Sequence, residues 1–187
     1  MYKIIALMGE SGCGKDYTAN TLTHCYPDKF HKVVADTTRP KRDNEKDGVD
    51  YNFISIEDFA GYVLDGTMLE ASCFNDDWYY GTNKNYLVED KINIVILNPI
   101  GLERLKENND ENIKVYSVYI QTEPLKRLTA CVLRESNPNC HEICRRFLAD
   151  EEMFKDFKAD LIYDHSDRLT YKYELEKIVD KILKLEW

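Results

Sequence analysis

A glycine-rich stretch near the start of the chain carries the residue types that bind phosphate groups. The sequence LMGESGCGKDYTAN begins at Leu7, and Gly9, Gly14 and Lys15 in it fit the pattern G-x-x-x-x-G-K. The backbone N–H groups of such a turn, at the start of a helix, point toward an anion, and the lysine can bridge the β- and γ-phosphates of a nucleoside triphosphate. We therefore predict phosphoryl transfer or nucleotide hydrolysis, in preference to a turn that only caps a helix. The predicted ATP-binding residues are Gly9, Ser11, Gly12, Cys13, Gly14, Lys15 and Asp16.

A basic cluster predicts a second phosphate site in a chain that is otherwise acidic. The formal net charge is −9 at pH 7, whereas Arg39, Lys41 and Arg42 stand together in the segment TTRPKR. Guanidinium groups bind phosphate oxygens in a bidentate manner, and the hydroxyls of Tyr51 and Tyr80 could hydrogen-bond to the same phosphate. The alternative is a solvated charged loop. We favour a site for the phosphate of an acceptor molecule.

The composition bounds the class of protein. The 187 residues suffice for one well-packed domain, and 43% hydrophobic with 32% charged residues is ordinary for a soluble protein. The negative net charge argues against non-specific binding to nucleic acid or to an anionic membrane. No apolar run has the length of a membrane span, and the first residues lead into a strand rather than a signal peptide, so we expect a cytoplasmic protein. We expect it to be a monomer or a homodimer.

The 6 cysteines are scattered along the chain, which favours free thiols in a cytoplasmic protein. Cys140, His141 and Cys144 lie close together, but the spacing C-x₃-C is the sole support for a zinc site there. We favour a helix that packs Cys144 against the rest of the protein.

Strand and helix patterns alternate along most of the chain. Alternation of this kind predicts right-handed βαβ units, and hence an α/β fold with a parallel sheet and helices on both faces. The expected strands are at residues 2–9, 31–35, 92–98, 113–120 and 159–164. The expected helices are at residues 16–26, 100–108, 124–135, 140–157 and 169–185.

Residues 36–82 interrupt this alternation. They are rich in turn-forming residues and contain short strand-like pieces around one short helix, at residues 51–55, 56–64, 67–74 and 78–82. No Gly/Ser-rich or Pro-rich linker flanks them, so we predict a small lobe inserted into one domain. The predicted organisation of residues 1–187 is a core of residues 1–35, 83–133 and 148–187, a lobe at about 36–82 and a helical lid at about 134–147.

Three motifs resemble those of the guanylate kinase family. The segment TTRPKRDNEKDGVDYNF resembles the family signature T-T-R-x-x-R-x-x-E-x-x-G-x-x-Y-x-F, and LEASCF…WYYGT resembles its L-E…Y-Y-G-[ST] stretch. LRESNPNCHEICRRF resembles the family's lid. The likeness covers nearly the whole chain, and it implies a P-loop α/β core with a lobe that binds a nucleoside monophosphate and a lid that closes over it.

The resemblance also implies roles for the matching residues. The residues that would bind the acceptor are Arg39, Arg42, Glu45, Tyr51, Glu70, Tyr80 and Thr82. Among them Glu70 and Thr82 would face the base, Glu45 would belong to the loop network, and the others would hold the monophosphate. The catalytic residues would be Lys15 and the lid arginines Arg134, Arg145 and Arg146.

Three positions depart from the family pattern. Asp16 stands in place of Ser or Thr, Asn98 in place of a strand-end carboxylate, and Ala35, followed by Asp36, in place of a Ser near the base. The GKD loop itself resembles that of phage deoxynucleoside monophosphate kinases. Because the carboxylate and the neutral group have exchanged places, we predict that Asp16 binds Mg²⁺ beside the triphosphate. The alternative is an acidic residue stabilised by the helix dipole.

The activity implied by the resemblance is transfer of the γ-phosphoryl group of Mg·ATP to GMP or dGMP. Positioning and charge neutralisation would supply the catalysis, without a side-chain nucleophile. Two alternatives remain. One is a deoxynucleoside monophosphate kinase that acts on another base, such as a pyrimidine or a modified base. The other is a non-catalytic guanylate kinase-like module that binds a phosphorylated partner. In the enzymatic interpretations the partners are small nucleotides, and neither nucleic acid nor a membrane is expected.

Overall fold

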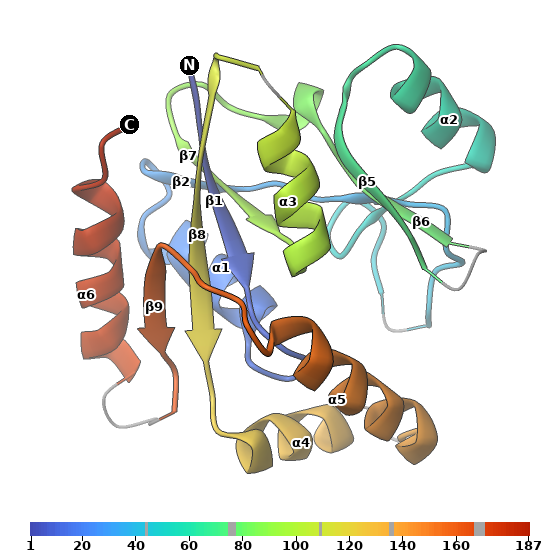
Figure 1. The fold of residues 1–187 in the computed structure, drawn as a ribbon, viewed down its shortest axis with the longest axis vertical. Coiled ribbons are helices and arrows are strands. Elements are labelled where there is room, and N and C mark those ends of the chain that lie inside the picture. Colours follow the sequence, from blue (N-terminus) through green and yellow to red (C-terminus); the bar gives the residue numbers. More distant parts are fainter. Residues whose placement is uncertain (44, 75–77, 109, 135–136, 167–170) are drawn as a thin grey trace.

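The computed structural model describes residues 1–43, 45–74, 78–108, 110–134, 137–166 and 171–187, and Figure 1 shows its fold. A five-stranded sheet forms the core, with the strand order β2-β7-β1-β8-β9, and every pair of neighbouring strands is parallel. The α/β fold with a parallel sheet is thus confirmed. The strands are β1 (Tyr2–Met8), β2 (Phe30–Lys32), β7 (Ile92–Ile96), β8 (Ile113–Gln121) and β9 (Leu161–Asp164).

The apolar sequence of β1 follows from its central position, because both of its faces are covered. Ile5 and Leu7 belong to one hydrophobic cluster, together with side chains of α1 (Lys15–Cys25) and α6 (Tyr171–Leu183). Ile4, Ala6 and Met8 point to the opposite face and pack in a second cluster that includes α3 (Pro99–Glu107). The strand is therefore a continuous apolar run rather than an alternating one. The predicted helices on both faces are confirmed.

A second, four-stranded sheet lies beside the core (Figure 1) and has the order β4-β3-β6-β5. Its strands and its helix are β3 (Asp36–Thr37), β4 (Asn52–Phe53), α2 (Ile56–Leu64), β5 (Met68–Phe74) and β6 (Trp78–Asn83). The N-cap of α2 is Ser55, whose hydroxyl accepts a hydrogen bond from the Asp58 backbone N–H. A short 3₁₀ helix, η1 (Lys84–Tyr86), leads back to the core.

Helix α3 attaches this lobe to the core through the backbone of β5, an edge strand. Asn108 Nδ2 donates to the Leu69 carbonyl at 3.1 Å, and Arg104 donates to the Ala71 carbonyl. Edge-strand carbonyls that the sheet leaves without a partner are thereby satisfied. The lobe is thus held against the helix that begins at the carboxyl end of β7.

Two helices lie at the end of the core toward which β1, β8 and β9 run (Figure 1): α4 (Pro124–Leu133) and α5 (Cys140–Phe154). The helix expected at residues 124–135 ends at Leu133, and residue 135 lies outside the described residues, as does part of the expected lid, residues 135–136. The start of the helix expected at residues 169–185 also lies outside them, and α6 is described from Tyr171 onward.

Strand β3 was not expected from the sequence, and β2 ends at Lys32 rather than at residue 35. All six cysteines are described, and each is a free thiol, as predicted. The prediction that Cys144 packs against the rest of the protein is wrong, because its place on α5 is exposed. Within the described residues, no helix is both long enough and apolar enough to cross a membrane.

Candidate active site

The glycine-rich loop connects the carboxyl end of β1 to the start of α1. Gly9, Gly12 and Gly14 have φ angles of 145°, 79° and 96°, which residues with a Cβ rarely adopt. A Cβ at Gly12 would lie 2.3 Å from the Arg127 carbonyl oxygen, so the loop packs too closely on α4 for any side chain there. Gly14 is the N-cap of α1 and makes no side-chain cap hydrogen bond. The first N–H groups of α1 are therefore suited to an anion.

Lys15 folds back over this loop. Its Nζ donates to the carbonyl oxygens of Gly9 at 2.6 Å and of Glu10 at 3.2 Å. The Ser11 N–H donates to Asp150 of α5 at 2.7 Å, so a carboxylate contacts a loop N–H group. Cys13 is buried in the loop, and burial raises the pKa of its thiol. The loop thus carries two hydrogen-bond donors close together, the ammonium group of Lys15 and the backbone N–H of Ser11.

A buried arginine lies beside the loop and was not predicted from the sequence. The Arg127 side chain is only 3% exposed, its Nη1 lies 3.5 Å from Glu10 Oε1, and its Cζ lies 4.9 Å from the ring centroid of Phe147. Tyr119 donates to the other oxygen of Glu10 at 2.7 Å. From the sequence, an arginine in an amphipathic helix is expected on the surface. The burial of Arg127 depends on the packing of the loop against α4, which the sequence pattern does not show.

Asp16 and Asn98 each have a partner within the protein. The Asp16 side chain is 73% exposed, and its Oδ1 lies 3.1 Å from Lys32 Nζ. Asn98 is the N-cap of α3, and its Oδ1 accepts a hydrogen bond from the Gly101 N–H at 2.7 Å. Asparagine and aspartate both serve well as N-caps, so this position has a structural use that is independent of a metal. Among the described residues, no group of three or more His, Cys, Asp or Glu side chains could hold a metal ion.

The basic segment of the lobe is organised around Glu45. Arg39 donates to both carboxylate oxygens of Glu45, at 2.8 and 3.0 Å, and the Arg42 N–H donates to it at 2.9 Å. Burial acts to raise the pKa of Glu45, but the hydrogen bonds from Arg39 and Arg42 lower it overall. The rings of Tyr51 and Tyr80 lie 5.7 Å apart, and Arg39 lies over the Tyr51 ring at 5.5 Å. The structure therefore brings these five predicted residues together.

The predicted base-facing pair is also in contact. Glu70 on β5 lies opposite Thr82 on β6, and the Thr82 hydroxyl donates to Glu70 Oε1 at 2.8 Å. The Glu70 residue is only 7% exposed. Burial raises the pKa of Glu70 to about 7, although the Thr82 hydrogen bond and the nearby charge of Arg104 act to lower it. A buried carboxylate with so few partners is suited to accept hydrogen bonds from a ligand.

Asp36 lies on the opposite face of the lobe's sheet. Asp36 pairs with Gly81, whereas Glu70 pairs with Thr82, and neighbouring strand positions alternate between the two faces. The Asp36 carboxylate is fully buried and accepts from Asn52 Nδ2 at 2.9 Å. Burial raises its pKa. Asp36 therefore belongs to the packing of the lobe and not to the face that carries Glu70.

Two of the three arginines predicted for the lid, Arg145 and Arg146, share one partner, Glu142. Arg145 donates through two nitrogens to the Glu142 carboxylate, at 2.7 and 2.9 Å, and Arg146 donates to it at 2.8 Å. These hydrogen bonds, above all that from Arg145, lower the pKa of Glu142 to about 2. Arg134 is the C-cap of α4, and it lines a small cavity of about 20 Å³ together with Arg146. Arg134 and Arg146 thus line one cavity between α4 and α5, and Arg145 shares the Glu142 carboxylate with Arg146.

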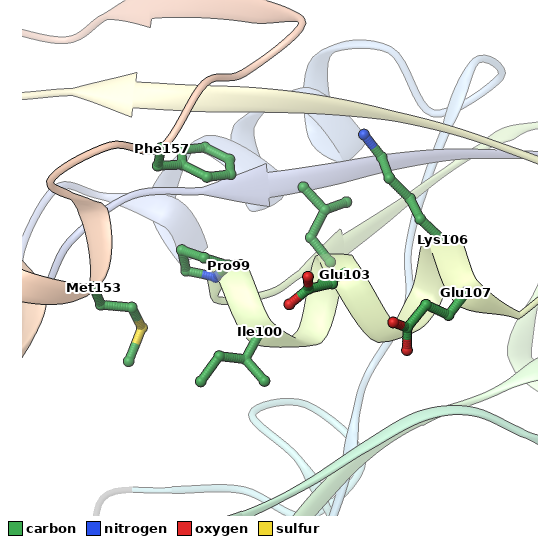
Figure 2. A pocket seen from close by; sticks show the side chains of 8 residues that line it. Pro99, Ile100, Glu103, Lys106, Glu107, Met153 and Phe157 are labelled. Atoms are coloured by element: carbon green, nitrogen blue, oxygen red, sulfur yellow. The ribbon is translucent and has the colours of Figure 1, made fainter.

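A larger pocket of about 680 Å³ lies between α3 and the end of α5 (Figure 2). Pro99, Ile100, Met153 and Phe157 give it an apolar wall, and charged residues of α3 flank it. None of the predicted nucleotide-binding residues lines it. The position of this pocket therefore differs from that of the nucleotide-binding residues predicted from the sequence.

Comparison with known proteins gives consistent results. The family model "Guanylate kinase" matches residues 1–182. Guanylate kinase of Helicobacter pylori is 30% identical over 188 residues, which cover 98% of this chain and 86% of that protein. Guanylate kinase of Hydrogenovibrio crunogenus is 32% identical over 165 residues, which cover 84% and 78% of the two chains. Protein PALS1 of Danio rerio is 31% identical over 142 residues, but these cover only 21% of that protein.

The crystal structure of guanylate kinase from Anaplasma phagocytophilum has the same fold, with a TM-score of 0.65 and 21% identity, and the match covers 97% of this chain and 85% of that one. The family match extends over nearly the whole sequence, and it includes the glycine-rich loop, the lobe and helices α4 and α5. This chain therefore belongs to the guanylate kinase family of P-loop nucleoside monophosphate kinases.

Proposed function

We propose that this protein transfers the γ-phosphoryl group of ATP to GMP or dGMP, giving ADP and GDP or dGDP. The buried carboxylate of Glu70 is the observation that supports this acceptor most strongly. Guanine presents its N1–H and its 2-amino group as adjacent donors, which one carboxylate accepts together. Adenine presents an acceptor at N1, which would face Glu70 with repulsion. A buried polar site that leaves its groups unpaired discriminates by about 10⁴-fold.

The basic segment supports binding of the acceptor's phosphate. Glu45 fixes the Arg39 guanidinium through both of its oxygens, so the arginine is held before the ligand arrives. The Arg42 side chain is 47% exposed and remains accessible to a phosphate. Tyr51 stays protonated at neutral pH, because burial, followed by the neighbouring Tyr80, raises its pKa to about 12. In this proposal the hydroxyls of Tyr51 and Tyr80 donate hydrogen bonds to the phosphate.

In this proposal Lys15 and the lid arginines stabilise the transferring phosphoryl group. Lys15 would exchange its contacts with loop carbonyls for phosphate oxygens. Arg134, Arg145 and Arg146 would move from the neighbourhood of Glu142 onto the nucleotide as the lid closes. Closure would exclude water and so suppress hydrolysis of ATP. No side chain needs to form a covalent intermediate.

A magnesium ion would neutralise charge on the phosphates of ATP. The residues present fit this role, because Mg²⁺ commonly keeps several waters and takes one or two carboxylates in addition to the phosphates. Asp16 is exposed beside Lys15, and we propose that its carboxylate would hold the metal, directly or through water. We further propose a cytoplasmic protein that acts on small nucleotides.

An assay of ATP consumption with each common nucleoside monophosphate and deoxynucleoside monophosphate tests the proposal. GMP or dGMP should give the highest kcat/KM. Glu70→Gln should abolish the preference over AMP, whereas the matched change Glu57→Gln, at an exposed position on α2, should retain it. A pyrimidine monophosphate as the best acceptor would contradict the guanine assignment. ATP binding without transfer to any monophosphate would favour the alternative of a non-catalytic module that binds a phosphorylated partner.

A further inference from the structure

Lys32 brings a second ammonium group close to the phosphate loop. Its Nζ lies 3.1 Å from Asp16 Oδ1 and 3.2 Å from Asn20 Oδ1, two acceptors one turn apart on α1. The Lys32 side chain is only 15% exposed, although β2 is an edge strand of the core sheet. The lysine is therefore held along α1 rather than extended into solvent.

Asp16 creates a charge problem that Lys32 can offset. The first turn of α1 attracts phosphate through its N–H groups and the positive end of the helix dipole. A carboxylate at Asp16 occupies the same turn and repels a triphosphate bound by the adjacent Lys15. A serine or threonine at this position would bring no charge, so no compensating cation would be needed. The ammonium of Lys32 lies within ion-pair distance of the added carboxylate.

The influence of Asp16 extends across to the lobe. After burial and the neighbouring Tyr80, the charge of Asp16 is a further cause that raises the pKa of Tyr51. The charge of Asp16, which follows Lys15 in the loop proposed for ATP, thus also acts on a residue proposed for the acceptor's phosphate. An unbalanced charge at this place would affect the binding of both substrates.

We propose that Lys32 is a positioning residue for the donor nucleotide. It fixes the Asp16 carboxylate and compensates its charge, so that the Asp16–Lys32 pair acts as one unit in the place of a neutral hydroxyl side chain. This inference rests on the proposed function in one respect, namely that the loop binds the phosphates of ATP. It names a role for a residue that no motif in the sequence indicated.

Calorimetric binding of ATP in the presence of EDTA tests the inference without a metal and without turnover. Lys32→Met should weaken ATP binding by about tenfold at low ionic strength, and the loss should shrink as salt is raised to about 0.5 M. Lys32→Arg should bind nearly as well as the wild type. The double change Asp16→Ser with Lys32→Met should restore binding, because it removes the carboxylate together with its partner.

Lys29→Met is the matched control, because it removes the same charge from an exposed position just before β2. It should leave ATP binding unchanged. Thermal unfolding of every variant shows whether the fold survives. Under a purely structural role, Lys32 would only tie β2 to α1, and then the double variant would bind ATP no better than Lys32→Met and the loss would not depend on salt.

Two further outcomes separate this inference from the proposed function. If the wild type phosphorylates GMP but Lys32→Met binds ATP normally, the inference is wrong and the proposed function stands. If the wild type neither binds ATP nor phosphorylates any monophosphate, the proposed function is wrong and the inference is wrong with it.

Discussion

Titration of Glu70 should control the binding of the acceptor between pH 6 and pH 8. The carboxylate must be ionised to accept both donors of guanine, and burial raises its pKa to about 7 from a usual value of 4.5. At pH 6 about one tenth of the empty sites would be ionised, so kcat/KM for GMP should rise about tenfold from pH 6 to pH 8. The phosphate of GMP titrates in the same range, with a pKa of about 6. Comparison with Glu70→Gln removes this contribution, because both proteins receive the same ligand.

The same pKa has a consequence for the stability of the empty protein. The folded state retains the Glu70 proton up to about pH 7, whereas the unfolded chain loses it near 4.5. The unfolded state therefore binds fewer protons in this interval, and this group makes the folded state less stable as the pH rises from 4.5 to 7. A shift of this size corresponds to at most about 3.5 kcal/mol. Glu70→Gln should thus be more stable than the wild type at pH 8 but not at pH 4.5.

Two measurements check these expectations together: initial rates with GMP and urea unfolding, each at several pH values, for the wild type and for Glu70→Gln. The pH-dependent rise in kcat/KM should be much smaller in the variant. A rise of the same size in both proteins, together with parallel stability profiles, would show that Glu70 is ionised throughout this range and would refute the reasoning.

The remaining predictions concern the donor loop and the base. Lys15→Ala should lower kcat by at least about 100-fold, from a loss of about 3 to 4 kcal/mol of transition-state stabilisation, and retention of more than about a tenth of the rate would refute the role of the loop. Asp16→Ala should lower kcat and raise the Mg²⁺ concentration that gives half-maximal activity. The double change Asp16→Ser with Asn98→Asp should restore part of the lost activity, because it rebuilds the ordinary arrangement of a loop hydroxyl and a strand-end carboxylate, and aspartate at position 98 still caps α3. If this Mg²⁺ concentration is unchanged in Asp16→Ala, Asp16 does not bind the metal and is only an acidic residue stabilised by the helix dipole. Ala35→Ser should lower the KM for GMP by supplying a donor to the guanine O6, a hydrogen bond of about 1 kcal/mol or more, and an unchanged KM would exclude that contact.

The sequence predicted those features that depend on local pattern. The apolar run of β1 and the glycines after it each carry their own signal, so β1 and the loop appear in the structure where expected, and α2 has the bounds expected for the short helix of the lobe. Strand β3 has only two residues, one of them the buried Asp36, and an isolated pair of polar residues gives no strand signal.

The sequence pattern could not predict features that depend on contacts between residues far apart in the chain. Arg127 and Lys32 both read as surface cations, yet packing of the loop on α4 buries the first and a contact with α1 orders the second. The orientation of Asp36 was likewise undetermined, because a shift of one residue in strand register moves a side chain to the opposite face. The pairing of Asp36 with Gly81 settles that orientation.

Phosphorus NMR of the protein with ATP, GMP and Mg²⁺ tests the central claim most directly, since it follows the transferred group itself. Our account predicts that the β- and γ-phosphate signals of ATP decline while those of ADP and the β-phosphate signal of GDP appear together. Release of inorganic phosphate without GDP would indicate hydrolysis instead of transfer. Unchanged ATP and GMP signals would mean that the chain is not a guanylate kinase in activity, and either result would contradict the account.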